Sequence, residues 1–513
     1  MRKSKFIAVF ALILCLVFAF AACSDLGGEF RQNPSDKYNP APGVNEQTDE
    51  DNGQTDGGQY IPIVDNPDVD TSENALSSFS VDHSTAYYAN LRRLINTKYS
   101  VIKPDAVRVE DMLNYFKYDY AQPGEDDVFA FNTEIVPAPW NEDNYVASIA
   151  FTTAEAALDG LPASNLVFLI DISGSMGSPS KLSLVKEALL YFIENGPMRE
   201  QDTMSIVTYS NVIKVPVKGA PAGSTGLKNA VEALYASGAT AGGAGLQKAY
   251  EVARELYVEG GNNRVMLITD NDFNIGISSE QELAEFIAGQ RVKDGKPVYL
   301  SVLGVGTESV AVFSKMETLA RHGNGNFSFL DRQEEARRVL IEEYGSVVYT
   351  VAKDVKTQVE FNPAYIKTFR LLGYETKLLT DEEFDDSKTD AGEIGPGYAV
   401  TALYEIQFHE GELPSTMGEN FFKVTLRYKD PESNEDREVL WFAGEEHMSD
   451  ECTSDMLFKL SVAETALVLR NSKHKGTASL QRALSRINTL PSVQEDYYKQ
   501  EFANLIATLI ERG

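Results

Sequence analysis

Between residues 165 and 345 the hydrophobic pattern alternates between buried strands and amphipathic helices. Residues 165–170, Asn-Leu-Val-Phe-Leu-Ile, are apolar at every position after the first, as in a strand covered on both faces. The next segment, residues 181–194, instead has helical spacing, with Leu182, Val185, Leu189, Phe192 and Ile193 on one face. Further strands are expected at 203–209, 212–217, 264–269, 298–305 and 326–330, and helices at 225–235, 245–257, 280–290, 310–320 and 333–345. This alternation predicts an α/β fold with a doubly wound, mostly parallel sheet.

The flanks of this unit have different periods. Before it, helical spacing at 85–96 and 107–116 is followed by strand patterns at 129–133 and 145–152. After it, an antiparallel set of strands and then three helices are expected, at 355–361, 366–372, 398–408, 421–428 and 438–442, and at 457–471, 478–490 and 497–510.

The α/β unit begins with a strand and ends with a helix, so both of its chain ends leave the edge opposite the carboxyl ends of the strands. We therefore predict that strands from the two flanks share one β-sandwich, and that Asp171 and its neighbours lie at the free end. The domains are then expected at 1–22 (signal peptide), 23–75 (linker), 76–160 (amino-terminal module), 161–350 (α/β domain), 351–450 (β-rich module) and 451–513 (helical region).

The amino terminus has the pattern of an export signal. Arg2, Lys3 and Lys5 precede the uncharged apolar residues 6–20. This stretch is shorter than the roughly 20 residues that a transmembrane helix needs. Ala21-Ala22-Cys23 resembles a bacterial lipobox, although Phe20 departs from its usual Leu or Val, so we expect cleavage before Cys23 and lipidation of Cys23. The alternative is an ordinary signal peptide with a chance cysteine.

Charge and composition limit the partners. The segment 24–75 is rich in Asp, Gly, Asn, Gln and Pro, and predicts a disordered acidic linker that follows the lipid-attached cysteine. The net charge of the chain is -30, which disfavours nucleic acid and anionic lipid headgroups. Lipid must then hold the protein at the membrane, on the extracytoplasmic side of the cell envelope. Without Cys15 and Cys23, Cys452 is the remaining thiol, and no intrachain disulfide is expected.

Oxygen-bearing side chains follow two of the buried strands. Asp171, Ser173 and Ser175 come at the end of the first strand, and Asp270 follows the strand 264–269, so the carboxyl edge of a parallel sheet brings them together. Thr240 lies on the glycine-rich loop 237–243 between them. Hard divalent cations prefer such oxygen ligands, whereas zinc prefers His or Cys, which these segments lack. We expect Mg²⁺ here, with Mn²⁺ or Ca²⁺ as alternatives.

The same residues resemble a known family. Asp171-Ile-Ser173-Gly-Ser175, Thr240 and Asp270 match, in order and strand context, the metal-ion-dependent adhesion site of von Willebrand factor type A domains. This resemblance implies a Rossmann-like fold in which the serines and the threonine touch the metal and an acidic residue of a protein partner completes its shell. Asn271 departs from the glycine that usually follows the last aspartate. The flanks, at 79–93, 105–116, 372–375 and 390–395, resemble modules of bacterial secreted type A proteins.

Other interpretations of these motifs remain open. Asp171-x-Ser-x-Ser alone is compatible with a helix start capped by Ser178 or Ser180. Asp272 and Glu308 sit near strand ends, where they either tune the site or are solvated. The acidic run 381–386 is expected to be a charged surface loop, with a calcium site as the alternative.

An enzyme is not expected. The five histidines are scattered along the chain, no Gly-x-Ser-x-Gly is present around Ser175, and no glycine-rich segment has the Lys-Ser/Thr of a nucleotide-binding phosphate loop. Two hypotheses follow. The first is a lipid-anchored cell-surface protein that binds the Asp or Glu of a protein partner through a divalent cation. The second is an envelope scaffold or assembly factor whose metal site is regulatory or vestigial.

Overall fold

The computed structural model describes residues 60–81, 84–98, 100–157, 160–270, 280–306, 311–409, 420–449 and 451–512. The expected signal peptide, Cys23 and residues 24–59 of the expected linker lie outside this part of the chain. Within the described ranges, no helix combines the length and the apolar character needed to cross a membrane.

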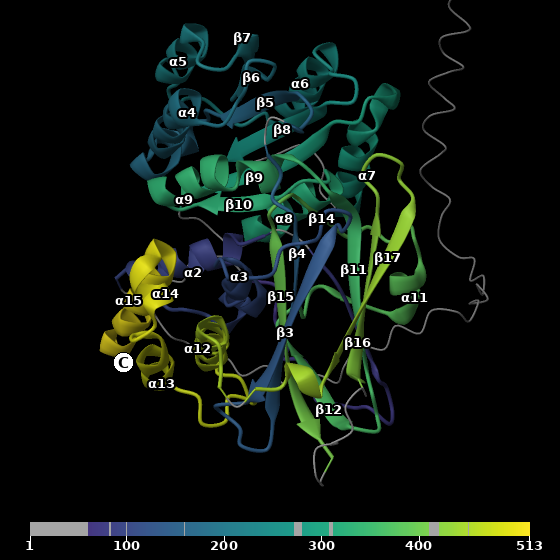
Figure 1. The fold of residues 1–513 in the computed structure, drawn as a ribbon. Coiled ribbons are helices and arrows are strands. Elements are labelled where there is room, and N and C mark those ends of the chain that lie inside the picture. The colour runs from purple at the N-terminus through teal and green to yellow at the C-terminus, as the bar shows by residue number, and fades with distance from the viewer. Residues whose placement is uncertain are drawn as a thin grey trace, which may run out of the picture. The chain divides into compact units, whose positions relative to one another are not determined.

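A six-stranded sheet forms the centre of the α/β unit, in the order β10-β9-β8-β5-β6-β7 (Figure 1). Its strands are β5 (Ser164–Asp171), β6 (Thr203–Tyr209), β7 (Ile213–Pro221), β8 (Asn262–Thr269), β9 (Tyr299–Val305) and β10 (Phe327–Leu330). β5 is parallel to both of its neighbours, β6 and β8, and β7 runs antiparallel at the edge. The expected mostly parallel sheet is thus confirmed.

Helices cover both faces of this sheet because successive side chains of each buried strand point to opposite sides. Leu166, Phe168 and Ile170 of β5 pack on one face with α4 (Leu184–Asn195) and α5 (Thr225–Glu232). Val167 and Leu169 pack on the other face. The helices of that face are α6 (Gly242–Glu255), α7 (Glu280–Arg291) and α8 (Ala311–His322). The unit is therefore doubly wound, as predicted.

The last helix of the unit is not continuous, although the pattern at 333–345 predicts one helix. It consists of α9 (Gln333–Arg337), a π-helical turn (Arg338–Glu342) and α10 (Tyr344–Val348). The Glu343 amide donates to the Arg338 carbonyl at 2.8 Å, which closes the wider turn. The turn directs the Arg338 guanidinium over the Tyr115 ring, 3.7 Å from its centroid.

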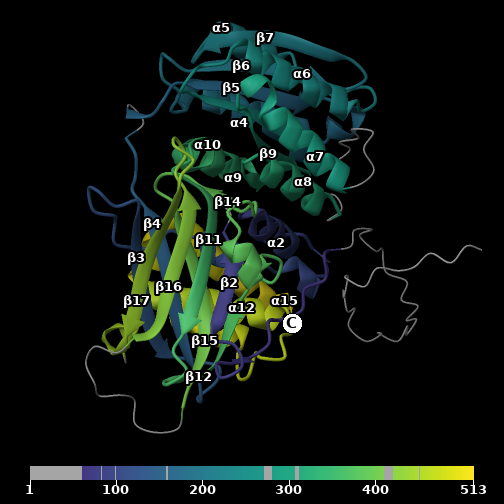
Figure 2. The same cartoon turned by 90° about the vertical axis from the view of Figure 1, so that its right-hand side faces the viewer.

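Strands from both flanks build two further sheets that enclose one hydrophobic core. The first sheet contains β1 (Val69–Asp70), β12 (Ile366–Leu372), β15 (Ala399–Phe408), β4 (Tyr145–Thr153) and β3 (Phe129–Pro137). The second contains β13 (Leu378–Leu379), β2 (Leu76–Ser80), β11 (Ala352–Phe361), β16 (Asn420–Lys429) and β17 (Asp436–Gly444), with β14 (Gly392–Ile394) beside β11. Figure 2 shows β11, β16 and β17 of the second sheet beside β3 and β4 of the first. The predicted β-sandwich shared by the two flanks is confirmed.

A helical layer covers the outer face of the first sheet. It comprises α2 (Ala86–Asn96), α3 (Val109–Asn114), α12 (Ser454–Leu469), α13 (Leu480–Ile487), α14 (Pro491–Glu495) and α15 (Tyr497–Arg512). Its core joins the outward side chains Val136, Val146 and Leu403 of the sheet. Helices from the two ends of the folded chain thus share one hydrophobic cluster.

Residues 60–75, which we expected to belong to the disordered linker, are part of the folded structure. Val69 and Asp70 pair with β12. The Asn66 side chain donates to the carbonyls of Leu371 and Gly373 at 2.9 and 2.8 Å. The segment is fixed by hydrogen bonds from its polar side chains, so its composition did not predict its order.

The carboxylates of the acidic run 381–386 are exposed, as expected of a charged surface segment, but the run forms a short helix and not a loop. Asp381–Asp385 forms the short helix α11, and Thr380 and Glu383 make a reciprocal capping box at its start. Phe384 is buried and fixes this turn against the β-sandwich. The carboxylates are therefore at a helix start, where the helix dipole favours negative charge.

Candidate metal centre

The predicted site residues lie at the point where the connections of the central sheet reverse direction. From β5 the chain proceeds to β6 on one side, and it later returns to β8 on the other side. Asp171 ends β5 and Asp270 directly follows β8, so both carboxylates lie at the carboxyl ends of adjacent parallel strands. Open α/β sheets bind their ligands in the crevice at this position.

Asp171 is fully buried and held by three hydrogen bonds. Its Oδ1 accepts from the Ser173 amide at 2.8 Å, and its Oδ2 accepts from the Tyr209 hydroxyl at 3.0 Å and the Thr269 hydroxyl at 3.2 Å. Burial raises the pKa of Asp171, and the bonds from Ser173 and Tyr209 oppose that rise. The carboxylate is therefore fixed in orientation by groups on β6, on β8 and in its own loop.

Ser173 and Ser175 bring two hydroxyl oxygens together beside Asp171. Their Oγ atoms are 2.9 Å apart. Neighbouring ligands of an octahedral Mg²⁺ at about 2.1 Å from the ion are themselves about 3 Å apart. The two hydroxyls thus have the spacing of adjacent ligands of one cation.

The loop that carries Thr240 is fixed to the loop of Asp171 by backbone hydrogen bonds. The Gly174 amide donates to the Gly238 carbonyl at 2.9 Å, and the Ser237 amide donates to the Ile172 carbonyl at 2.8 Å. Gly238 has a φ of +85°, and a Cβ there would lie 2.6 Å from the Asn211 Oδ1. A residue with a side chain would be strained in this turn and would displace Asn211. The loop that carries the partly exposed Thr240 therefore lies against the loop of the two serines.

Asp270 is 3% exposed and has one oxygen in use. Its Oδ2 accepts from the Lys181 ammonium at 2.9 Å. Its Oδ1 is buried and has no hydrogen-bond partner. Leaving a buried carboxylate oxygen unpaired costs about 1–3 kcal/mol or more, so this atom is placed to accept a cation or a cation-bound water.

Lys181 is a residue of the site that the sequence pattern did not reveal. Its spacing assigns it to the start of a helix, but it lies at a kink within Pro179–Ser183, where its backbone is not helical (φ -118°, ψ -106°). This backbone directs the side chain inward, where it is 4% exposed. The sequence feature that could have indicated this buried position is a lysine directly before Leu182, where the apolar face of the helix begins.

The capping interpretation of the serine motif is not supported by the contacts. The hydroxyls of Ser178 and Ser180 are 3.1 Å apart, and no side chain caps α4. Among the described residues, no group of three or more His, Cys, Asp or Glu side chains is placed to hold a metal. The candidate set instead combines two carboxylates with three hydroxyls, which suits a hard divalent cation. Asn271, Asp272 and Glu308 lie outside the described residues.

Comparison with known families agrees with this fold. The family profile "von Willebrand factor type A domain" matches residues 165–342, "von Willebrand factor" matches 54–147, and "Uncharacterized protein YfbK, C-terminal" matches 346–511. These matches define a von Willebrand factor type A domain protein with a further carboxy-terminal module. The chain is 35% identical over 470 residues to "Uncharacterized protein YfbK" of Escherichia coli (strain K12), which covers 87% of this chain and 80% of that protein. It belongs to the YfbK family.

Other known proteins match a smaller part of this chain and at lower sequence identity. "Inter-alpha-trypsin inhibitor heavy chain H3" of Mus musculus is 28% identical over 274 residues, which are 50% of this chain and 30% of that one. The solved structure "von Willebrand factor type A from Catenulispora acidiphila" matches 72% of this chain and 88% of its own, with 17% identity and a TM-score of 0.39.

Proposed function

We propose that this protein is a cell-envelope lipoprotein that binds a protein partner through a divalent cation. The cation, Mg²⁺ in the first instance, is held by Asp171, Ser173, Ser175, Thr240 and Asp270. The single observation that carries the proposal is the buried, unpartnered Oδ1 of Asp270 at the sheet edge that also holds the paired serine hydroxyls. We propose no catalytic role for the chain.

In this proposal the cation supplies an electrophilic centre for a carboxylate of the partner. The protein's own residues do the positioning. Asp171 fixes the serine loop through the Ser173 amide, and the backbone bonds of Gly174 and Gly238 fix the threonine loop against it. Repulsion from the acidic chain is screened beyond about 8–10 Å at physiological salt, so the cation acts at contact.

Membrane attachment is the second part of the proposal. Lipid on Cys23 anchors the chain outside the cytoplasm, and the acidic segment after it serves as a tether. Replacing Cys23 with Ser should release the protein from the membrane fraction and abolish incorporation of labelled palmitate. A Cys452→Ser variant is the matched control, because Cys452 belongs to the folded part and is not the predicted lipid site.

The binding proposal is tested first by titrating Mg²⁺ into the protein in a calorimeter and then by affinity capture from envelope extracts. The test variant is Ser173→Ala/Ser175→Ala. The control is Ser178→Ala/Ser180→Ala, which removes a similar hydroxyl pair from the same loop. We expect Mg²⁺ binding and partner capture to be lost in the first variant and in EDTA, and kept in the control. Capture that persists in excess EDTA would support the scaffold hypothesis instead.

A further inference from the structure

We infer that the cleft around Lys459 binds a small zwitterion, either a free amino acid or a short peptide with both termini free. The carboxylate of the ligand lies at Lys459 and its ammonium at Asp119. The elements that form the cleft belong to the flanks of the chain and not to the α/β unit. The inference is therefore independent of the proposed cation site.

The cleft has the size and the construction of a ligand site. Its volume is about 470 Å³, and small-molecule sites occupy roughly 300–1,000 Å³. It lies between β3, the first turns of α12 and Ser492 of α14. The amide and the hydroxyl of Thr453, at the start of α12, donate to the Glu134 carboxylate of β3 at 2.9 and 2.6 Å. Hydrogen bonds thus hold two walls of the cleft together.

Lys459 is the most deeply buried residue that lines the cleft, at 3% exposure. Its Nζ donates to the Ser148 hydroxyl at 2.8 Å. The same atom lies 5.6 and 5.1 Å from the ring centroids of Tyr118 and Tyr120. These groups stabilise an ammonium but bring no negative charge to it. A buried charge is costly unless it is paired, so an anion in the cleft supplies a missing partner.

The two nearest carboxylates do not serve as this partner. Glu134 binds the start of α12, and Asp455 accepts from the Asp119 amide at 2.6 Å and from the Lys499 ammonium at 3.2 Å. Burial lowers the pKa of Lys459 to about 8, and the charges of Glu134 and Asp455 oppose that fall. Neither carboxylate forms an ion pair with Lys459 in the part of the chain that the structure describes.

Two further donors with unused capacity line the same cleft. The Ser492 hydroxyl and the Asn132 Nδ2 are buried and have no hydrogen-bond partner. Buried polar groups are almost always paired, with protein, water or ligand. Together with the remaining N–H groups of Lys459, these donors suit a ligand group with two acceptor oxygens, as in a carboxylate.

The rim of the cleft carries the opposite charge. Asp119 is exposed, and its carboxylate has no hydrogen bond or ion pair among the described residues. Three carboxylates and the Lys459 ammonium line the cleft, so the field at its mouth disfavours a simple anion. A ligand that also carries an ammonium offers Asp119 a partner. The combination of a buried cation and an acidic rim therefore favours a zwitterion over a singly charged molecule.

The experiment measures the binding of four probes to the full chain by saturation-transfer NMR. Glycine and triglycine carry both charges, N-acetylglycylglycine carries only the carboxylate, and triglycine amide carries only the ammonium. Lys459→Met keeps the buried stem and removes its charge, and Asp119→Asn removes the charge of the rim. The matched controls are Lys473→Met and Glu125→Gln, which change exposed charges.

We expect glycine or triglycine to bind the wild type about tenfold or more tightly than either singly charged probe. Binding of glycine assigns the site to free amino acids, and binding of triglycine alone assigns it to peptides. Lys459→Met should abolish this binding, Asp119→Asn should abolish the preference over N-acetylglycylglycine, and both controls should behave as the wild type. EDTA should have no effect, because no cation takes part.

Three results overturn the inference. They are no binding of either zwitterion to the wild type, equal binding of a singly charged probe, and binding that survives Lys459→Met. Should Lys459→Met not fold, Asp119→Asn decides, because it changes an exposed side chain, and an unchanged preference in that variant overturns the inference. Each of these results leaves the proposed cation site standing, since loss of Mg²⁺ binding is measured separately.

Discussion

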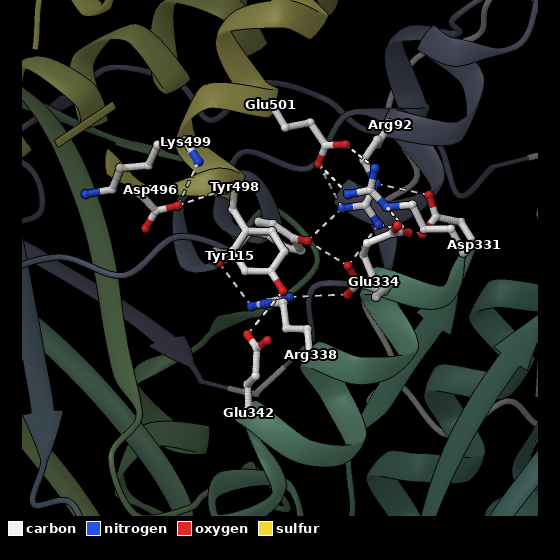
Figure 3. Close-up of polar contacts among 12 residues, drawn as sticks. Arg92, Tyr115, Asp331, Glu334, Arg338, Glu342, Asp496, Tyr498, Lys499 and Glu501 are labelled. Atoms are coloured by element: carbon white, nitrogen blue, oxygen red, sulfur yellow. Dashed lines mark hydrogen bonds and ion pairs between the residues drawn. The ribbon is translucent and has the colours of Figure 1, made fainter. Parts of the chain in front are cut away.

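Arg92 donates from Nε to Oδ2 of Asp331 at 3.0 Å and from Nη2 to Oδ1 at 2.5 Å, a bidentate pair between the amino-terminal flank and the α/β unit. Arg92 is fully buried on α2, and Asp331 directly follows β10. The same guanidinium contacts Glu335 of α9 at 2.8 Å. It also contacts Glu501 of α15 at 3.6 Å (Figure 3). The Arg92 guanidinium thus joins three separate parts of the chain.

Replacing Arg92 with Met should destabilise the protein by about 3–5 kcal/mol, because three carboxylates lose their shared cation inside the protein. Urea denaturation at neutral pH measures this change. Arg437→Met is the control, since Arg437 is half exposed and pairs with the exposed Glu435, and we expect it to cost less than about 1 kcal/mol. Equal losses in the two variants would contradict a structural role for the buried pair.

The serine pair predicts a ligand-dependent stability. Mg²⁺ at about 100 times its dissociation constant should stabilise the wild type by about 2.7 kcal/mol, and it should not stabilise the Ser173→Ala/Ser175→Ala variant. Thermal unfolding with Mg²⁺ and with EDTA gives the comparison. The variant should lose little stability in EDTA, because each hydroxyl bonds to the other and both are removed together. A Mg²⁺ shift of equal size in both proteins would place the ion elsewhere.

Gly238 connects the two loops of the site, and its replacement by Ala should affect both folding and metal binding. The positive φ alone costs about 1–2 kcal/mol for Ala, and the contact with Asn211 adds to it. Gly223→Ala is the matched control, because Gly223 also has a positive φ, of +71°, but nothing lies within 4 Å of an added Cβ. Calorimetry with Mg²⁺ should show weakened binding for Gly238→Ala alone.

Glu393 predicts a pH dependence of stability. Burial and the charge of Asp354 raise the pKa of Glu393 to about 8, and its Oε2 has no hydrogen-bond partner. A carboxyl whose pKa is higher in the folded state stabilises the fold when it is protonated. This stability is complete below the unfolded pKa of about 4.5 and disappears as the pH rises to 8.

Replacing Glu393 with Gln should therefore stabilise the protein at pH 8 by about 3–5 kcal/mol more than at pH 4.5. Urea denaturation at the two pH values tests this. Glu432→Gln, on an exposed turn, should have little effect at either pH. A constant difference between Glu393→Gln and wild type across this range would show that the buried carboxyl does not titrate there.

The strands of the α/β unit are predictable because burial on both faces leaves an unbroken apolar run, as in residues 165–170. The same pattern predicts that Asp171 and Asp270 lie at one edge of the sheet. Parallel strands end at the same edge, and β5 and β8 are neighbours. The position of Thr240 on a loop is also predictable, because the glycines at 238, 242 and 243 mark that loop in the sequence. The distances between these groups are set by backbone bonds, such as Gly174 to Gly238, that no spacing rule contains.

The hydrophobic pattern did not predict three features of the structure, and each has a physical reason. Residues 60–75 fold through hydrogen bonds of polar side chains, and these have no periodicity. The buried position of Lys181 depends on a kink in the backbone, where its φ and ψ are not helical. The break at Glu343 follows a π-helical turn whose Arg338 contacts Tyr115, a residue far away in sequence.

The shared β-sandwich also constrains the order of events during synthesis. Gln358 donates to the Ser78 hydroxyl across 280 residues, and β2 finds its partner β11 only after the whole α/β unit has been made. During translation the α/β unit, whose strands pair locally, is complete while β2 still lacks β11 and β4 still lacks β15. Unpaired strands of this kind are prone to aggregate. β2 and the free edge of β4 therefore need protection until β11 and β15 emerge from the ribosome or from the export channel.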